Sequence, residues 1–409
     1  MVTEDFYMRN SMKTYYVESV IEKIGQNIKA LIDKRVITDD KKIVLYGLDT
    51  FSFGMRTILA NLGFKVDSYI SEDSEQVVRY KRYVKAVSSR YLNSLRDLIG
   101  IYDLEERLAD FDENLLILSG SKNCPKRRLE ELKHQEQVNF FQVYDWEQDK
   151  FAEFVRDKKK ISLKEIQNIE KEMLSQVDQF CIENGIRYWV CGGTLLGTIR
   201  HKGFIPWDDD IDLFLPWKDY KRFLEEFKTA GRYDLIIPDK ADKKDYFELW
   251  AKMIDNHTVV REHVDFMRKV HPVSIDIFPL IGMPRGAEER KRFFEEFSEL
   301  DKKIWEDFYA NNGSLGVYDK WYPSQKKFLE MYDFDESSHV GVLGTAYREN
   351  DCTTKKVYDS TLRMPFEDIE VNVPAGFQVY LDNLYGKGWQ ELPDESRRVS
   401  NHNVEAYWL

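Results

Sequence analysis

The chain has 409 residues, of which 43% are hydrophobic and 14% aromatic, so it can form about two or three domains with sizeable cores and is not intrinsically disordered. Its formal net charge of −12 argues against a general nucleic-acid-binding protein, because such a protein needs a basic face to release counterions. The four cysteines form no Cys-x-x-Cys pair, which argues against a zinc ribbon and fits a reducing compartment.

The first 150 residues alternate helical and strand-like stretches. Apolar spacing predicts helices over 11–37 and 52–62, and strands over 42–47, 65–70, 114–119 and 137–144. This alternation implies a parallel sheet with helices on both faces. We therefore expect an α/β protein whose residues 1–150 form a Rossmann-like domain.

The turn over residues 47–54 occupies the position of a dinucleotide-binding loop but is not a G-x-G-x-x-G sequence. Asp49 replaces the second glycine and would repel a pyrophosphate brought close to the backbone. The domain therefore lacks the standard dinucleotide motif. Docking, dimerisation and acceptor recognition remain open as its roles.

A polar, charged stretch over residues 145–162 marks the predicted domain boundary, and residues 162–409 form the second domain. Ser162 and Glu165 form a capping box that opens a helix, which Gly185 ends. Further elements predicted in chain order are a strand over 187–190, a helix over 216–227, a strand over 247–254 and a helix over 285–308. Residues 309–360 look less regular and form either a lid over the site or an ordinary surface insertion.

Acidic residues enter an apolar strand after residue 207. Side chains two apart on a strand share a face, so Asp210 and Asp212 project together while Ile211 and Leu213 face a core. Asp208 joins them if the strand starts early. Carboxylates held this close repel unless a proton or a cation lies between them, and a hard divalent cation is the natural partner. The alternative is a solvated turn.

Two neighbouring features weigh against the solvated turn. Gly192, Gly193 and Thr194 form a small-residue turn that leads into a loop, and its backbone amides can hold a phosphate. Asp276 stands alone in an otherwise apolar, strand-like run, and an unpaired buried charge is costly. A structural hydrogen bond could explain Asp276, but a third metal carboxylate on an adjacent strand is the better account.

The order of a Gly-Gly turn, an acid-x-acid strand and a single later acid resembles the nucleotidyltransferase superfamily, and more closely the LicD family of phosphotransferases, which includes the fukutin-related proteins. Residues 188–216 carry most of the resemblance, with further pieces at 251–256, 275–280 and 384–386. It covers about residues 162–409 and implies an α+β catalytic domain with a nucleotidyltransferase-like fold. The gap of 16 residues between Gly193 and Asp210 is longer than in many nucleotidyltransferases but suits a LicD-type insertion carrying Arg200 and Trp207.

The chemistry we expect is metal-assisted phosphoryl transfer with Mg²⁺ or Mn²⁺. Asp210 and Asp212, with Asp208 as a further ligand, would hold the cation that bridges the donor's phosphates. Asp276 would either complete a second metal site or accept the proton of the acceptor hydroxyl as general base.

Other residues are predicted to hold the donor. Gly193 and Thr194, beside Gly192, would donate amide hydrogen bonds to a non-bridging phosphate oxygen. Arg200 offers a planar fork for phosphate, or alternatively forms a salt bridge to one of the acids. Lys252 lies in an apolar run and would contact the donor phosphate. Trp207 either lines the site or packs in the core.

The resemblance to LicD proteins implies a CDP-alcohol donor, with CDP-choline as the leading case. Phosphocholine would pass to a hydroxyl of a cell-surface glycan or teichoic-acid precursor, which could be lipid-linked, and CMP would be released. The alternatives are a nucleotidyltransferase or polyol-phosphate transferase that uses another nucleotide donor, and a non-catalytic scaffold.

The amino terminus lacks the basic start and apolar core of a signal peptide, and no apolar run approaches about 18 residues. We therefore expect a cytoplasmic protein without a transmembrane segment. Peripheral attachment at the inner face of the membrane is left open.

Overall fold

The computed structural model describes most of the chain. The described residues are 16–47, 50–71, 101–103, 114–120, 130, 139–143, 150–229, 231–243, 245–264, 267–311, 314–345, 347–394, 398 and 404–409. Asp49, in the turn that departs from the dinucleotide motif, lies outside them.

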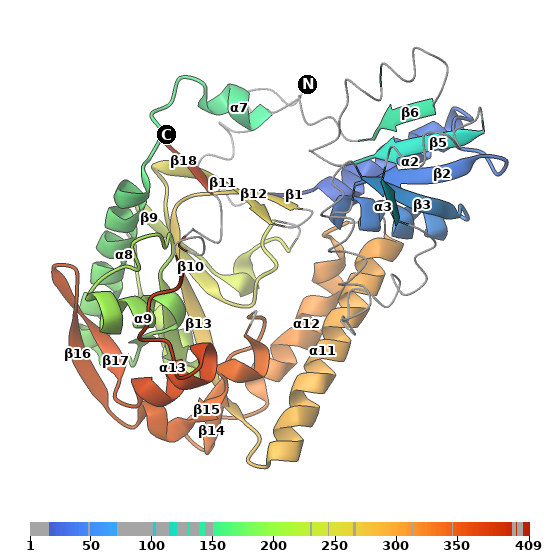
Figure 1. The fold of residues 1–409 in the computed structure, drawn as a ribbon. Coiled ribbons are helices and arrows are strands. Elements are labelled where there is room, and N and C mark those ends of the chain that lie inside the picture. Colours follow the sequence, from blue (N-terminus) through green and yellow to red (C-terminus); the bar gives the residue numbers. More distant parts are fainter. Residues whose placement is uncertain are drawn as a thin grey trace.

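A five-stranded, entirely parallel sheet forms the amino-terminal part of the molecule (Figure 1). Its strands, in order across the sheet, are β4 (Ile101–Asp103), β3 (Val66–Ser71), β2 (Lys42–Tyr46), β5 (Leu115–Ser119) and β6 (Asn139–Gln142). Every residue of β5 is buried, as expected for a parallel strand covered on both faces. The predicted α/β class is confirmed, although β4 was not predicted.

Helices α2 (Val20–Asp33) and α3 (Thr50–Asn61) pack together beside this sheet. The predicted helix over 11–37 is wrong at its start, because Tyr16–Ser19 form strand β1 instead. The backbone of β1 pairs with residues 267–270, which are distant in sequence, so a long-range contact decides this segment. Gly63 follows α3 with a φ of +90°, the left-handed conformation typical of a glycine that ends a helix.

Two long helices, α11 (Ala287–Ala310) and α12 (Val317–Glu330), reach the amino-terminal part (Figure 1). Leu300, Ile304 and Phe308 of α11 share one apolar core with Ile24 and Ile28 of α2. The parts before and after the predicted boundary are therefore joined by a common core. Residues 309–360 are also more regular than expected, since they include α12.

A mixed, seven-stranded sheet forms the centre of the carboxy-terminal part. Its main path runs through β15 (Thr353–Thr354), β14 (His339–Gly341), β13 (Ser274–Met283), β10 (Ala251–Asp255) and β9 (Tyr233–Ile236). β8 (Asp212–Pro216) pairs in parallel with β13, and β7 (Trp189–Val190) pairs antiparallel with β8. The strand β13, which carries Asp276, thus lies directly beside β8, which begins at Asp212.

Helices, a hairpin and short turns surround this sheet. They are α8 (Leu163–Asn184), α9 (Gly192–His201), η3 (Pro238–Lys240), α10 (Trp217–Glu226), η4 (Arg348–Asp351), η5 (Lys355–Tyr358), β16 (Thr361–Phe366), β17 (Ile369–Pro374) and α13 (Phe377–Tyr385). The predicted capping box is present, because the Ser162 side chain accepts the Glu165 amide and the Glu165 side chain accepts the Ser162 amide. Gly185 ends α8 in the left-handed conformation, as predicted.

A separate four-stranded antiparallel sheet brings together distant parts of the chain. Its order is β1, β12 (Met267–His271), β11 (Thr258–Val264) and β18 (Glu405–Trp408). The predicted polar boundary is held against it, because Ile161 N donates to Ala406 O at 2.8 Å and Trp408 N donates to Lys159 O at 2.9 Å. Within that boundary, Lys150–Val155 form the unpredicted helix α7.

None of the described helices combines the length and the apolar character needed to cross a membrane.

Candidate active site

Two predicted catalytic acids face each other across neighbouring strands. Asp212 at the start of β8 is the register partner of Asp276 on the parallel strand β13. Their neighbours Leu213, Ile275 and Ile277 are fully buried, so both acids occupy the opposite, more open face. The structure therefore brings together these two side chains, as the sequence predicted.

The acidic residues before Asp212 lie outside the strand β8. We expected Asp210 to lie on the strand with Asp212, and this is wrong because β8 begins at Asp212. The alternation nevertheless continues: Asp208, Asp210 and Asp212 are half-buried, whereas Asp209 and Ile211 are buried. The three predicted metal carboxylates thus keep a common side without a complete strand ladder.

The Gly-Gly segment is the first turn of helix α9, not a turn that leads into a loop. Leu195 N donates to Cys191 O at 2.9 Å, which closes the first helical turn. A Cβ atom on Gly193 would lie 2.7 Å from Asp208 Oδ2, and one on Gly192 would lie 3.0 Å from Asp212 Oδ2. The glycines therefore allow two carboxylates to approach the positive end of this helix.

The three residues predicted to hold a donor phosphate, Gly192, Gly193 and Thr194, have different hydrogen-bond partners. Thr194 Oγ1 accepts the Asp212 amide at 2.9 Å, which fixes the start of β8 to the helix. The Gly192 amide donates to Tyr380 Oη at 3.3 Å and so points toward the protein interior. Gly193 and Thr194 contribute the next amides of the first turn, where N–H groups lack acceptors within the helix.

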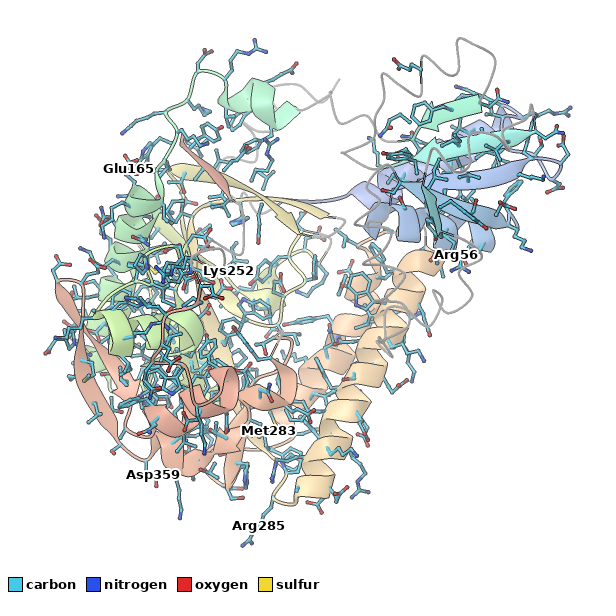
Figure 2. The ribbon with its side chains drawn as sticks, viewed as in Figure 1. Arg56, Glu165, Lys252, Met283, Arg285 and Asp359 are labelled. Atoms are coloured by element: carbon cyan, nitrogen blue, oxygen red, sulfur yellow. The ribbon has the colours of Figure 1, made fainter. Side chains whose placement is uncertain are left out.

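Lys252 lies on β10 directly opposite Asp276. Its ammonium forms an ion pair with Asp276 Oδ1, and Trp250 Nε1 donates to Asp276 Oδ2 at 2.9 Å. The Lys252 side chain is 12% exposed and that of Asp276 19%. Lys252, which we predicted to contact the donor phosphate, is thus paired with a carboxylate in this structure. Figure 2 shows Lys252 within the carboxy-terminal part.

The electrostatics of the site are dominated by carboxylates. Burial raises the pKa of Asp212 well above its usual range, and the charges of Asp210, Asp276 and Asp208 raise it further, while Lys252 acts in the opposite direction. The donor set consists of hard oxygen ligands, and a divalent cation would relieve their repulsion.

A ready-made metal cage is absent from the part of the chain that the structure describes, where no three histidine, cysteine, aspartate or glutamate side chains form one. Both oxygens of Asp276 accept hydrogen bonds from Lys252 and Trp250, which accounts for its orientation. The residues present fit a divalent cation by their chemistry, since all are hard oxygen ligands, and binding would have to draw the carboxylates together.

Glu170 on α8 is a candidate that sequence reasoning missed. It is 1% exposed, and its Oε2 atom has no hydrogen-bond partner among the described residues. Burial and then the charges of Asp210, Asp209 and Asp208 raise its pKa well above the usual range. A signal was present, because Glu170 occupies the apolar stripe of its helix beside Ile169.

Two tyrosines near Asp212, Tyr347 and Tyr385, were also not predicted from the sequence. Tyr347 is 41% exposed and forms an edge-to-face pair with Tyr385, with ring centroids 5.9 Å apart. Burial raises both tyrosine pKa values, and the charge of Asp212 contributes to each. Tyr347 comes from an irregular segment and Tyr385 from the end of α13, so no local spacing joins them.

Arg200 and Trp207 have structural contacts. Arg200 donates to the carbonyls of Trp389 at 2.9 Å and Glu391 at 3.2 Å, so the described contacts include no salt bridge to an acid. Trp207 is half-buried against the main core, which favours the packing alternative.

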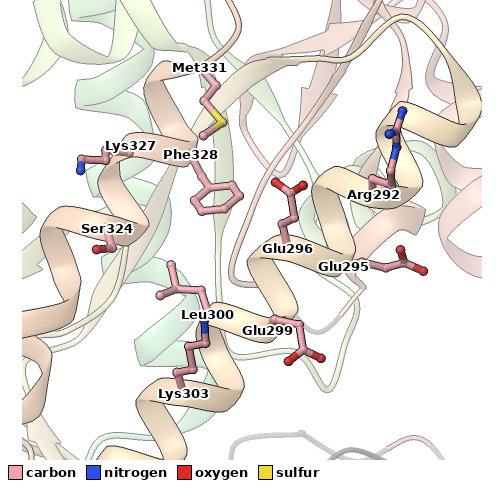
Figure 3. A pocket seen from close by; sticks show the side chains of 10 residues that line it. All are labelled: Arg292, Glu295, Glu296, Glu299, Leu300, Lys303, Ser324, Lys327, Phe328 and Met331. Carbon is pink, nitrogen blue, oxygen red and sulfur yellow. The ribbon is translucent and has the colours of Figure 1, made fainter.

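A groove of about 570 Å³ lies between α11 and α12 (Figure 3). Leu300, Phe328 and Met331 contribute apolar surface, while glutamates, lysines and an arginine alternate around them. None of the predicted site residues lines this groove. Because its charges are mixed and do not converge, we assign it no role in the chemistry.

Comparison with known proteins supports the assignment of this region. The LicD/FKTN/FKRP nucleotidyltransferase domain matches residues 185–310, a range that includes every predicted site residue. The lipopolysaccharide cholinephosphotransferase LicD of Haemophilus influenzae is 27% identical over 270 residues, which cover 61% of this chain and 100% of that protein.

Two other relatives match over smaller shares of their length. The human ribitol 5-phosphate transferase FKRP is 54% identical over 70 residues, which cover 16% of this chain and 14% of that protein. The mannosyltransferase regulator 4 of Saccharomyces cerevisiae is 25% identical over 218 residues, which cover 48% of this chain and 16% of that protein. Both likenesses therefore concern a part of each relative.

Proposed function

The chain belongs to the LicD family of phosphotransferases, and we propose that it transfers a phosphoalcohol group to a hydroxyl of a cell-surface glycan or teichoic-acid precursor. The leading donor is CDP-choline, from which phosphocholine is transferred and CMP released. The observation that carries this proposal is the in-register pair of Asp212 and Asp276 beside the first turn of α9.

The proposed reaction is a displacement at phosphorus. The acceptor oxygen forms a bond to the phosphorus that bears the alcohol, and the bond from that phosphorus to the bridging oxygen breaks, so CMP leaves with the electron pair. Asp276 is the candidate to accept the hydroxyl proton. A bound Mg²⁺ or Mn²⁺, held by Asp208, Asp210, Asp212 and Asp276, would neutralise charge on the attacking and leaving oxygens.

The protein's own groups would orient the donor. The amides of Gly193 and Thr194 would donate to a non-bridging phosphate oxygen at the positive end of α9. Lys252, which neutralises Asp276 in the structure, lies close enough to Asp212 to lower its pKa and could follow the phosphate charge when the donor binds.

A cationic alcohol is favoured by the aromatic edge of the site. A trimethylammonium group is stabilised by aromatic faces, in addition to nearby carboxylates. Tyr347 and Tyr385 supply such faces beside Asp212. This supports a choline donor over a neutral polyol donor, which is the alternative suggested by the ribitol 5-phosphate transferase relative.

The proposal extends to the finer fold and location. The strand order of the parallel sheet, with β2 at its centre, supports a Rossmann-like unit within residues 1–150, and the family match supports a nucleotidyltransferase-like unit within residues 162–409. We place the reaction on the cytoplasmic side of the membrane, where CDP-alcohols are available, with a lipid-linked acceptor within reach.

The test compares donors under one set of conditions. The purified protein is incubated with Mg²⁺, a cell-envelope glycan fraction and either CDP-choline, CDP-ribitol, or a nucleoside triphosphate with a sugar phosphate. We expect CMP release and label transfer from CDP-choline. Release of pyrophosphate without CMP would identify a nucleotidyltransferase and overturn the proposal.

A further inference from the structure

A buried carboxylate that is distant in sequence from the acidic segment is connected to the first turn of α9. Asp351, at the end of η4, is 2% exposed. Its Oδ2 accepts the hydroxyl of Thr345, and its Oδ1 accepts the hydroxyl of Tyr380 at 3.2 Å. Asp351 lies outside the segment that matches the nucleotidyltransferase domain, and neither it nor Tyr380 was predicted.

Tyr380 connects this carboxylate to the helix. Tyr380 is 1% exposed on α13, and its Oη also accepts the amide of Gly192 at 3.3 Å. A tyrosine hydroxyl has a single proton, and the Gly192 amide needs an acceptor. The proton of Tyr380 therefore points to Asp351, and the hydrogen bonds run in one direction from Gly192 through Tyr380 to Asp351.

The position of Gly192 gives this connection a consequence for the site. Gly192 has a φ of +52° and no room for a side chain beside Asp212. Its neighbour Cys191 donates its amide to Asp212 O at 3.0 Å. Fixing the Gly192 peptide thus fixes both the first turn of α9 and the start of β8, including the Gly193 amide.

The buried charge argues that this connection has a role beyond packing. An asparagine or an apolar pair could fill the same space without the free-energy cost of a buried carboxylate. Burial raises the pKa of Asp351 to about 6, although the hydrogen bonds from Thr345 and Tyr380 lower it. A costly group retained in contact with a catalytic turn is typical of a functional position.

We propose that Asp351 and Tyr380 are positioning residues that orient the Gly192 peptide and thereby the phosphate-binding turn of α9. This inference rests on the proposed function for its catalytic consequence, but the hydrogen-bonded chain itself can be tested without a substrate.

Five thiol and phenol groups face Asp351, and none of them changes charge near pH 6, whereas Asp351 does. They are Cys191 before α9, Tyr358 on η5, Tyr380 on α13, and Cys352 and Tyr347 beside η4. Burial raises the pKa of each of these thiols and phenols above its usual range, so all remain neutral at pH 6. The charge of Arg290 lowers the pKa of Cys352 and that of Glu349 raises it.

The first measurement uses the ligand-free full chain labelled with ¹⁵N-glycine. In the wild type, we expect the Gly192 amide resonance to include a titration step near pH 6 and the amide to be protected from hydrogen exchange. Tyr380→Phe is isosteric and should abolish the protection and this step, while Asp351→Asn should abolish this step; a step that persists in both variants reports the neighbouring Asp212. A Gly192 resonance that is the same in wild type and Tyr380→Phe would overturn the chain.

The second measurement uses CMP release from CDP-choline. We expect Tyr380→Phe and Asp351→Asn to raise the donor KM about tenfold, the effect of one lost buried hydrogen bond. Thr345→Val removes a hydrogen bond to Asp351 without touching Tyr380, so it serves as the matched control and should change KM less. Unchanged KM and kcat in Tyr380→Phe, with the Gly192 resonance altered, would overturn the positioning role.

The two failures are distinguishable. If the wild type releases no CMP from CDP-choline, the proposed function fails while the glycine resonances still decide whether the hydrogen-bonded chain exists. Thermal unfolding of each variant, followed by circular dichroism, identifies any that does not fold.

Discussion

The carboxylates of Asp212 and Asp276, on adjacent strands of one sheet, have opposite electrostatic surroundings. Asp276 has a lysine ion pair and a tryptophan hydrogen bond, whereas Asp212 makes no ion pair with any residue that the structure describes and is surrounded by further acids. A buried acid elsewhere in the fold, Asp255, has an arginine partner in Arg232.

The difference indicates that the two sides of the site have different tasks. Buried acids with cationic partners contribute to a stable fold, while the Asp212 side keeps a charge imbalance that a ligand must relieve. The predictions below test whether function and stability divide along this line.

Asp212→Asn should have the largest effect on activity. Loss of the charge that holds the cation predicts a fall in CMP release of about a thousandfold. Stability to urea in the presence of EDTA should stay the same or rise, because a like charge leaves an acidic cluster. The matched control is Asp219→Asn, which breaks a hydrogen-bonded pair with Arg187 and should lower stability while sparing turnover per folded molecule. A fully active Asp212→Asn would remove this side from the mechanism.

Lys252→Met should lower both the stability of the fold and the turnover. It leaves Asp276 without its cation, which we expect to cost about 2 kcal/mol of unfolding free energy because the pair is partly exposed. Turnover should fall about a hundredfold, as when one charge-stabilising donor is removed. Lys252→Arg keeps the charge and should recover most of the stability. Equal urea midpoints for wild type and Lys252→Met would contradict the contrast drawn above.

Tyr347→Ala should change donor preference more than fold stability, since Tyr347 is exposed. Loss of a cation–π contact worth about 1 kcal/mol predicts a fall of about fivefold in kcat/KM for CDP-choline. CDP-ribitol, which has no cationic group, should be little affected, and Tyr347→Phe should resemble the wild type. An equal loss for both donors would mean that Tyr347 does not recognise the alcohol.

Asp351→Asn should show an effect on stability that depends on pH. The folded pKa of about 6 lies above the ordinary value of 3.8, so the folded state binds this proton more tightly than the unfolded state. Wild-type stability therefore falls as pH rises between these values, and the variant does not share this loss. Relative to wild type, the variant should gain about 2 kcal/mol between pH 4 and pH 7 in urea titrations. A constant difference across this range would contradict the assigned pKa.

Local patterns were sufficient to predict much of the fold and part of the site. Alternating apolar residues placed β8 and β13, and their parallel pairing brought Asp212 to Asp276. The capping box and Gly185 gave the limits of α8. These features depend on residues close together in the sequence, where spacing and backbone preference decide the conformation.

The remaining features depend on partners that spacing cannot identify. The glycines at 192 and 193 were expected in a turn before a loop, but the residues after them form a helix whose first turn is fixed by Tyr380 and by the Asp212 backbone. The ion pair of Lys252 required knowledge that β10 and β13 are neighbours. Asp351 comes from an irregular segment near the end of the chain, so no local pattern connects it to α9.

The four-stranded sheet has a consequence for how the molecule is made. Its strand β11 pairs on one side with β12, which in turn pairs with β1, and on the other side with β18, the last strand that the structure describes. During synthesis β11 leaves the ribosome long before β18 exists, so its outer edge must wait with unpaired backbone groups. Because contacts between distant segments form slowly, completion of this edge should be a late step in folding. A nascent chain stalled before residue 404 would expose that edge to chaperones or to another chain.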